Sequence, residues 1–270
     1  ALFYQEPETD TPVEFQRKHM QDMVRVGNKL PLYDMVSTIG ICRDVPDYLT
    51  DLIGSLEHFA NGTKPMVLLC SDEHKFDDVL RMFEMLHGDL GEKPFIIPYF
   101  NPVSPLVMNE GTVDKMKIAI ERGLPVIISN YSLSGATTPI TPAGTIAVLM
   151  AELLAGLVIG QLYKEGAPMF LGMLPVYLDM KTLLNFYDPQ SILDSLACAE
   201  MMAHYGIPYC CTSGSGTGWG MDLLAAETYW MNTLMMTLTK GGIAPFVGDT
   251  LGSKAVSPLT FIYCHEIIDQ

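Results

Sequence analysis

Short apolar runs alternate with longer amphipathic stretches from about Val36 to the end of the chain. Each run is rich in β-branched or aromatic residues and is short enough for a buried strand. The runs are VSTIGIC from Val36, PMVLLC from Pro65, PFIIPYF from Pro94, PVIISNY from Pro125, PMFLGML from Pro168, IPYCCTS from Ile207 and GIAPFVG from Gly242. Strands that alternate with helices are typical of a parallel sheet built from βα units, so the pattern predicts an α/β fold.

Helix start signals lie between these runs. A side chain that can cap a helix precedes an acid or a proline at Ser71-Asp72-Glu73, Thr141-Pro142, Asp188-Pro189 and Ser257-Pro258. With a further helix from Val13 to Lys29, the chain is expected to hold eight helices and seven clear strands. These numbers predict a (β/α)8 TIM-like barrel as a single domain over residues 1–270, with one strand weakly marked or outside the chain. An open doubly wound sheet is the alternative, although no predicted strand is followed by G-x-G-x-x-G.

Charge and cysteine content narrow the classes of partner and compartment. The chain has 31 acids and 16 bases, a formal net charge of -15, which disfavours nucleic acid and anionic membranes as partners. None of the six cysteines forms a C-x-x-C pair, which indicates free thiols in the cytoplasm. The segment from Ala143 to Leu162 is long and apolar enough for a membrane span, but Glu152 lies at its centre. We expect instead a helix buried between the sheet and a neighbouring subunit of a homo-oligomer.

Aromatic residues follow strand after strand where the carboxyl ends of a parallel barrel place working residues. They are Tyr99, Phe100, Tyr131, Tyr177, Trp219 and Phe246, with Asn101 beside the first two. Aromatic faces with a few carboxylates suit a cation that donates no hydrogen bonds, at ~0.5 to 2 kcal/mol per face. The sequence therefore predicts a substrate site for a quaternary amine, formed by these residues, with Arg43 as a candidate partner for a substrate carboxylate.

Metal and phosphate sites have little support. The six histidines make neither H-x-H nor H-E-x-x-H, and the adjacent Cys210 and Cys211 face opposite sides of a strand, so no bound metal is expected. The glycine-rich stretch TSGSGTGWGMD, from Thr212 to Asp222, matches neither phosphate-binding pattern and contains no lysine. Its glycines indicate a mobile or closely approached backbone.

Several longer segments resemble the trimethylamine methyltransferase superfamily of corrinoid-dependent enzymes. They are PYFNPVSPL from Pro98, SGATTPITPAGTIAVLMAELLAGLVIGQL from Ser134, PVYLDMKT from Pro175, ILDSLACAEMMAHYGIP from Ile192 and MDLLAAETY from Met221. The similarity covers nearly the whole chain, which looks like the central part of a longer family protein. It implies a βα barrel that moves a methyl group from an amine to the Co(I) corrinoid of a separate carrier protein.

The resemblance also implies a set of residues near the corrinoid. Carried over by position, they are Ser104, Gly135, Thr137, Asp179, Gly216, Gly218, Asp222 and Glu227. Trimethylamine members of the family carry pyrrolysine in the loop that aligns with Ser213 to Asp222, and this chain has none. It therefore resembles the members without pyrrolysine, which demethylate quaternary amines such as glycine betaine.

Three other functions stay open from the sequence. The chain is also compatible with trimethylamine demethylation, and with a non-catalytic binding protein for betaine-like osmolytes or for the corrinoid carrier. A barrel lyase or aldolase would need a lysine at a strand end, for which Lys181 is the nearest candidate.

Overall fold

The computed structural model describes residues 1–181, 185–186, 189–210, 214–241 and 246–270. The described α-helices are α1 (Arg17–Lys29), α2 (Thr50–Asn61), α3 (Phe76–His87), α4 (Glu110–Glu121), α5 (Pro142–Tyr163), α6 (Pro189–Tyr205), α7 (Leu223–Thr239) and α8 (Pro258–Asp269). The strands are β1 (Phe3–Gln5), β2 (Pro12–Glu14), β3 (Val36–Ser37), β4 (Met66–Leu68), β5 (Ile96–Phe100), β6 (Val126–Ser134), β7 (Met169–Leu178), β8 (Asn185–Phe186), β9 (Tyr209–Cys210), β10 (Asp249–Thr250) and β11 (Ala255–Val256).

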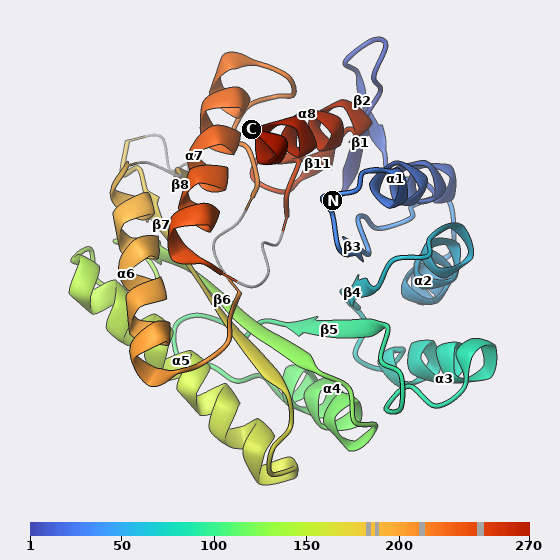
Figure 1. Cartoon of the computed structure of the whole chain (residues 1–270), viewed down its shortest axis with the longest axis horizontal. Helices are drawn as coiled ribbons and strands as arrows, with labels where there is room; N and C mark the ends of the chain where they lie inside the picture. The colour runs from blue at the N-terminus through green and yellow to red at the C-terminus, as the bar shows by residue number, and fades with distance from the viewer. Residues whose placement is uncertain (182–184, 187–188, 211–213, 242–245) are drawn as a thin grey trace.

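Six parallel strands form the central sheet, in the order β3, β4, β5, β6, β7 and β9. Figure 1 shows that the sheet curls and that α3 to α6 cover its outer side. The predicted α/β architecture with parallel βα units is confirmed. The described strands make a half-barrel, however, and a closed eight-stranded barrel is not confirmed.

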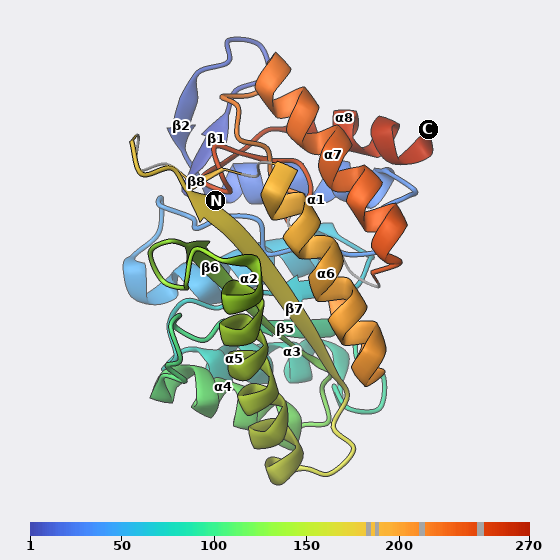
Figure 2. The same cartoon turned by 90° about the vertical axis from the view of Figure 1, so that its left-hand side faces the viewer.

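The pairing of β6 with β7 is the longest in the sheet. It runs from Val126 opposite Met169 to Ser134 opposite Tyr177. Helix α5 packs on both strands and α6 packs on β7, as Figure 2 shows from the outer side. Strand β7 (MFLGMLPVYL) is buried along most of its length and is almost entirely apolar, as expected for a covered parallel strand. Strand β6 (VIISNYSLS) instead carries buried polar side chains from Ser129 onward.

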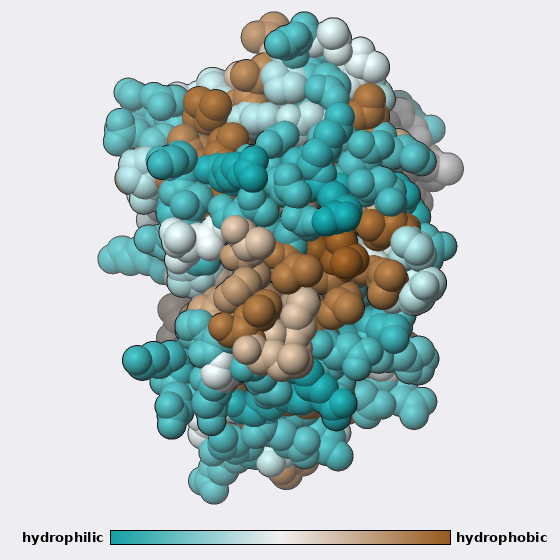
Figure 3. All heavy atoms as spheres, turned by 90° about the vertical axis from the view of Figure 1, so that its right-hand side faces the viewer, coloured by the Kyte–Doolittle hydropathy of each residue, from teal (hydrophilic) through white to brown (hydrophobic). Residues whose placement is uncertain are grey.

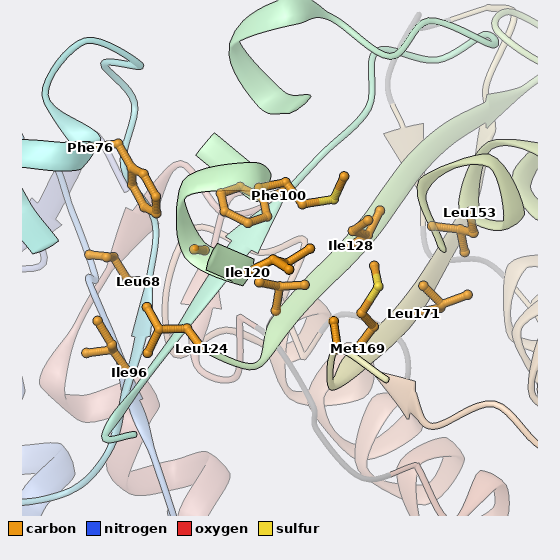
Figure 4. Packing of buried hydrophobic residues seen from close by; sticks show 14 of the residues in the cluster. Leu68, Phe76, Ile96, Phe100, Ile120, Leu124, Ile128, Leu153, Met169 and Leu171 are labelled. Atoms are coloured by element: carbon orange, nitrogen blue, oxygen red, sulfur yellow. The ribbon is translucent and has the colours of Figure 1, made fainter. Parts of the chain in front are cut away.

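Side chains alternate between the two faces of the curled sheet. On β5, Ile96 and Phe100 belong to the large core cluster beneath the helices, which Figure 4 shows. Ile97 and Tyr99 belong instead to a smaller cluster on the inner face, which also contains Ile127 of β6. The period of two along each strand thus separates an outer core from the interior of the half-barrel.

Three sequence expectations need correction near element boundaries. Residues 13–16, predicted as helix, hold part of β2 and the connection to α1, because β2 pairs with β1. Helix α3 begins at Phe76 rather than after Ser71, because Asp51 accepts a hydrogen bond from the backbone N–H of Asp72 at 2.7 Å and holds that segment as a turn. The predicted run from Gly242 lies partly outside the described residues, and its described part, 246–248, is a turn.

The two ends of the chain meet in a second, small sheet that the sequence does not indicate. Its order is β10, β11, β1 and β2, with β1 parallel to β11 and Phe3 opposite Ala255. Figure 1 shows α8 beside α1 as a result. This sheet fixes residues 249–256 against the amino-terminal strands and so positions the segment before them.

Helix α5 is long and apolar enough to cross a membrane, by length and composition alone. It packs on the sheet through the small residues that its sequence places four apart. A Cβ on Gly156 would lie 2.8 Å from Ile128 Cδ1, and one on Gly160 would overlap the sulfur of Met169. The glycines therefore serve close helix-to-strand contact within this fold.

The single carboxylate of α5 is buried and fully used. Glu152 is 2% exposed and accepts hydrogen bonds from Ser104 Oγ at 2.8 Å, the Leu106 N–H at 2.7 Å and Asn130 Nδ2 at 2.7 Å. These bonds join the loop after β5 to the middle of β6 and to α5. The carboxylate thus fixes a loop at the carboxyl edge of the sheet.

Apolar side chains also gather on the outer surface. Figure 3 shows them across the middle of the face that carries α1 to α3. The exposed large apolar residues of α2 and α3 are Leu56, Met85 and Leu86. Single exposed apolar residues are ordinary, but a continuous patch marks a surface that another element can cover.

We predict that Glu152→Ala lowers the free energy of unfolding by about 2 to 4 kcal/mol, because the Leu106 N–H and one hydrogen of the buried Asn130 amide lose their acceptor. Urea unfolding followed by circular dichroism measures the change. The control is Glu200→Ala at an exposed site on α6, for which a change within about 0.5 kcal/mol is expected. Equal effects of the two substitutions would contradict the role given to Glu152.

Candidate functional site

A cavity of about 310 Å³ lies on the inner side of the half-barrel. Its walls come from the segment before β3, from β4, β5 and β6, and from α7 and α8. Four aromatic residues and two acids line it: Tyr33, Tyr99, Phe246, Phe261, Asp34 and Asp249. The volume is at the small end of the range for ligand sites, which suits a small molecule.

The aromatic residues form two perpendicular pairs. Tyr99 and Phe246 have ring centroids 5.8 Å apart and an angle of 82° between their planes. Tyr33 and Phe261 have centroids 5.8 Å apart at 70°. The Tyr33 hydroxyl donates a hydrogen bond to the Phe261 backbone carbonyl at 2.7 Å, which fixes that ring. Perpendicular rings supply aromatic faces in different directions, the arrangement that a tetrahedral methylated ammonium group requires.

The two acids differ in their surroundings. Asp34 is exposed at the rim, whereas Asp249 is 7% exposed. Burial raises the pKa of the Asp249 carboxyl to about 7, although the ammonium of Ala1 and a hydrogen bond from Ser253 both lower it. A buried carboxyl of this kind gains from a neighbouring cation, which favours the charged form.

One residue in the wall of the cavity has a left-handed backbone conformation. Among the described residues other than glycine, positive φ occurs at Asp10, Leu106, Lys240, Phe246, Leu251 and Ser253. Phe246, with φ of 60°, lines the cavity itself. A bulky residue in this region costs about 1 to 2 kcal/mol and persists where its surroundings fix it, which occurs most often at functional sites.

Only two of the predicted substrate residues meet at the cavity, Tyr99 and Phe246. Tyr131 shares the inner-facing register of Ile127 but does not line the cavity. Trp219 is 45% exposed on the glycine-rich loop. Asn101 donates its side-chain amide to the Ser129 carbonyl at 2.7 Å and so ties β5 to β6.

Phe100 and Tyr177 lie on the other face of the sheet, and their assignment to one aromatic ring with Tyr99 is corrected. Phe100 packs against Phe76 in the outer core, with the two ring centroids 5.7 Å apart. The Tyr177 hydroxyl donates to Asp194 of α6 at 3.1 Å. Tyr99 and Phe100 are consecutive on one strand and therefore face opposite sides.

The residues carried over for the corrinoid do not cluster at the cavity. Several hold local turns and caps: Ser104 bonds Glu152, the Leu133 N–H donates to Thr137 Oγ1 at 2.9 Å, and the Lys181 N–H donates to Asp179 at 2.7 Å. Gly135, with φ of 91°, forms the turn after β6. Asp222 caps α7 by accepting the Ala225 N–H at 2.8 Å, and Glu227 is exposed on that helix. Their contact with a corrinoid stays a prediction.

The glycine-rich loop is described from Gly214, and Thr212 and Ser213 lie outside the described residues. Its glycines are buried at close approaches rather than at positive φ. A Cβ on Gly216 would lie 2.7 Å from Tyr229 Cζ, and one on Gly218 would overlap Asp222 Oδ1. The Gly216 N–H donates to the Asp249 carbonyl at 2.7 Å, and the Leu251 N–H donates to Gly218 at 3.1 Å. The closely approached alternative is the one observed.

Sequence reasoning missed four cavity residues, Tyr33, Asp34, Asp249 and Phe261. Tyr33 and Asp34 precede β3, at the amino end of the sheet, where a barrel mouth is not expected. Phe261 lies on α8, and no local pattern distinguishes it from a core residue. Asp249 lies three residues after the predicted site residue Phe246, and an acid so close to an aromatic candidate was the one signal in the sequence that pointed to it.

The described residues contain no candidate metal site. There, no group of three or more His, Cys, Asp or Glu is arranged to hold an ion. The described cysteines Cys42, Cys70, Cys198, Cys210 and Cys264 are free thiols. Cys211 lies outside the described part of the chain.

Comparison with known proteins identifies the family. The profile of the trimethylamine methyltransferase (MTTB) family matches residues 8–247. The chain belongs to this family. It is 26% identical over 201 residues to a glycine betaine methyltransferase of Desulfitobacterium hafniense, covering 73% of this chain and 42% of that protein. It is 26% identical over 200 residues to a trimethylamine methyltransferase of Methanosarcina barkeri, covering 73% and 39%.

A third relative of this MTTB-family chain is a proline betaine:corrinoid methyltransferase of Eubacterium limosum, 25% identical over 132 residues, covering 48% of this chain and 27% of that protein. The resemblance noted in the sequence is thus confirmed. The chain spans less than half the length of the curated relatives that it matches.

We predict that Gly216→Ala destabilises this family member by about 1 to 3 kcal/mol, because Tyr229 is buried and cannot move away from the added methyl. Chemical unfolding measures the change. Gly54→Ala is the matched control, since a Cβ there meets no atom closer than 3.8 Å and helix α2 gains about 0.5 to 1 kcal/mol. A stable Gly216→Ala protein would show that the loop yields.

We predict that Asp249→Asn changes the pH dependence of stability. The raised pKa of Asp249 means that the folded state holds a proton that the unfolded state releases between about pH 4 and pH 7. Wild-type stability therefore falls relative to the variant as the pH rises through this window, by up to about 1.4 kcal/mol per unit. Urea unfolding at several pH values, with Asp34→Asn as control, measures it. A constant difference between variant and wild type would contradict the assignment.

Proposed function

We propose that the protein transfers a methyl group from a quaternary amine to the Co(I) corrinoid of a carrier protein. The observation that carries the proposal is the inner cavity, where two perpendicular aromatic pairs and two acids meet. The family supports it, because relatives include glycine betaine, proline betaine and trimethylamine methyltransferases. The absence of pyrrolysine from the sequence favours a quaternary amine, which leaves as a neutral amine without further activation.

The chemistry assigns limited tasks to the protein. The carrier's corrinoid supplies the nucleophile that takes the methyl group, and the carbon–nitrogen bond breaks with its electron pair going to nitrogen. The chain must therefore hold the methyl carbon in line and favour neutral amine over cation. Aromatic walls at Tyr99 and Phe246 hold the ammonium without hydrogen bonds, and an apolar site disfavours the cation relative to the neutral amine that departs.

The surrounding assembly belongs to the same proposal. We infer that the half-barrel is part of an eight-stranded βα barrel, that the protein works in the cytoplasm as a homo-oligomer, and that the carrier protein is its partner. The apolar surface in Figure 3 and the exposed apolar side chains of α2 and α3, Leu56, Met85 and Leu86, support a contact with another polypeptide.

A binding protein without transferase activity is the second candidate. The cavity by itself is sufficient to bind a methylated amine, and only two of the predicted substrate residues line it. Trimethylamine is the alternative substrate. Both alternatives are separated from the proposal by the same assay.

We predict that the protein methylates the Co(I) corrinoid of a partner carrier when it is supplied with a quaternary amine. The absorbance of the methylated corrinoid measures the reaction. Tyr99→Leu keeps apolar volume but removes an aromatic face, so kcat/KM falls about 2- to 30-fold. Tyr48→Leu, at an exposed tyrosine that does not line the cavity, is the matched control and leaves kcat/KM unchanged. Amine binding without any methylation would support the binding protein, and activity with trimethylamine alone would support the other substrate.

A further inference from the structure

We propose that the cavity selects methylated ammonium compounds that carry no carboxylate and discriminates against zwitterionic betaines. The inference rests on the proposed function, because it concerns which amine the same site accepts. The expected preference differs from the substrate of a similar relative, which is named a glycine betaine methyltransferase.

The charges of the cavity carry the inference. Its described lining contains Asp34 and Asp249 and no lysine, arginine or histidine. A ligand carboxylate in this space would lose its water and lie beside two acidic side chains, with no lysine, arginine or histidine in the described lining to pair with.

Three basic groups near the cavity hydrogen-bond to backbone atoms, and Lys240, next to the lining residue Gly241, is exposed. Lys64 Nζ donates to the carbonyls of Gly27 and Leu30 at 3.0 and 2.6 Å. The Ala1 ammonium donates to the Ile39 carbonyl at 2.6 Å. His265 accepts the Leu32 N–H at 3.4 Å through Nε2, which leaves that nitrogen without a proton to donate.

Arg43, the sequence candidate for a substrate carboxylate, is exposed and does not line the cavity. The ammonium head, by contrast, meets both aromatic pairs and the exposed Asp34, and Asp249 lies beside them with the Ala1 ammonium as a neighbouring cation. Ser37 also lines the cavity, and its hydroxyl can donate to or accept from a neutral polar tail. The site therefore favours a cationic head with an uncharged tail.

Choline and glycine betaine form a matched pair for the test. They share the trimethylammonium head and differ at the other end, where choline has a hydroxyl and betaine a carboxylate. The neutral carbon isostere of choline, with a tert-butyl group in place of the ammonium head, isolates the contribution of the positive charge. All three are titrated calorimetrically into the wild-type protein at one pH and one salt concentration.

We expect choline to bind at least about tenfold more tightly than glycine betaine, because like charges placed together weaken binding strongly. The neutral isostere should bind more weakly than choline, since it gains no cation–π attraction. Betaine binding that equals or exceeds choline binding would overturn the inference. Equal binding of choline and its isostere would also overturn it, because charge would then play no part.

Variants locate the effect. Asp249→Asn should lower the ratio of choline to betaine affinity several-fold, and Asp34→Asn, at the exposed rim, should lower it less. Glu165→Gln, an exposed acid away from the cavity, changes the net charge equally and should leave the ratio unchanged. If Asp249→Asn does not fold, the wild-type ligand series and Asp34→Asn still decide.

Methyl transfer separates the two proposals. Preferential binding and demethylation of betaine would overturn the charge selectivity and leave the proposed function intact. Selective choline binding with no methylation of corrinoid from any amine would overturn the proposed function and leave the selectivity intact. If none of the three compounds binds and no amine is demethylated, both proposals fail.

Discussion

The parallel pairing of β6 with β7 is the constraint on which the rest of the fold depends. It holds Val126 to Ser134 in register with Met169 to Tyr177, and α5 and α6 pack on its outer face. With this register fixed, successive side chains along each neighbouring strand face alternately the helices and the interior. The same rule assigns Tyr99 to the cavity and Phe100 to the outer core, although they are neighbours in the sequence.

A buried carboxylate connects this sheet to the loop after β5. Helix α5 is apolar on nearly every side, and Glu152 is the one acid that it carries into the core. Its three hydrogen bonds reach two residues of that loop and one of β6. Part of the sequence signature shared with the family thus has a structural explanation. Its glycines Gly156 and Gly160 let α5 approach the sheet closely, and its acid Glu152 fixes the loop after β5.

The cavity forms where segments distant in sequence meet. Tyr33 comes from the segment before β3, Tyr99 from β5, Asp249 from β10 and Phe261 from α8. The small terminal sheet holds Asp249 in place through β10, and Phe246, with φ of 60°, lies just before it. A site assembled in this way combines aromatic faces with two acids and, in its described lining, no basic side chain. This combination, more than the family, supports a cationic ligand.

The sequence by itself determined the repeated βα pattern, the number of helices and the family, because hydrophobic periodicity, capping residues and long shared segments are local properties. It also placed Tyr99 and Phe246 among the candidate site residues. Only the tertiary structure decided that Phe100 and Tyr177 face the helices, that the glycines of 214–220 are packing contacts, and that Tyr33, Asp34, Asp249 and Phe261 join the site. The reason is physical. The direction of a side chain depends on strand register, and its neighbours in space depend on contacts between segments far apart in the sequence. No local pattern encodes either.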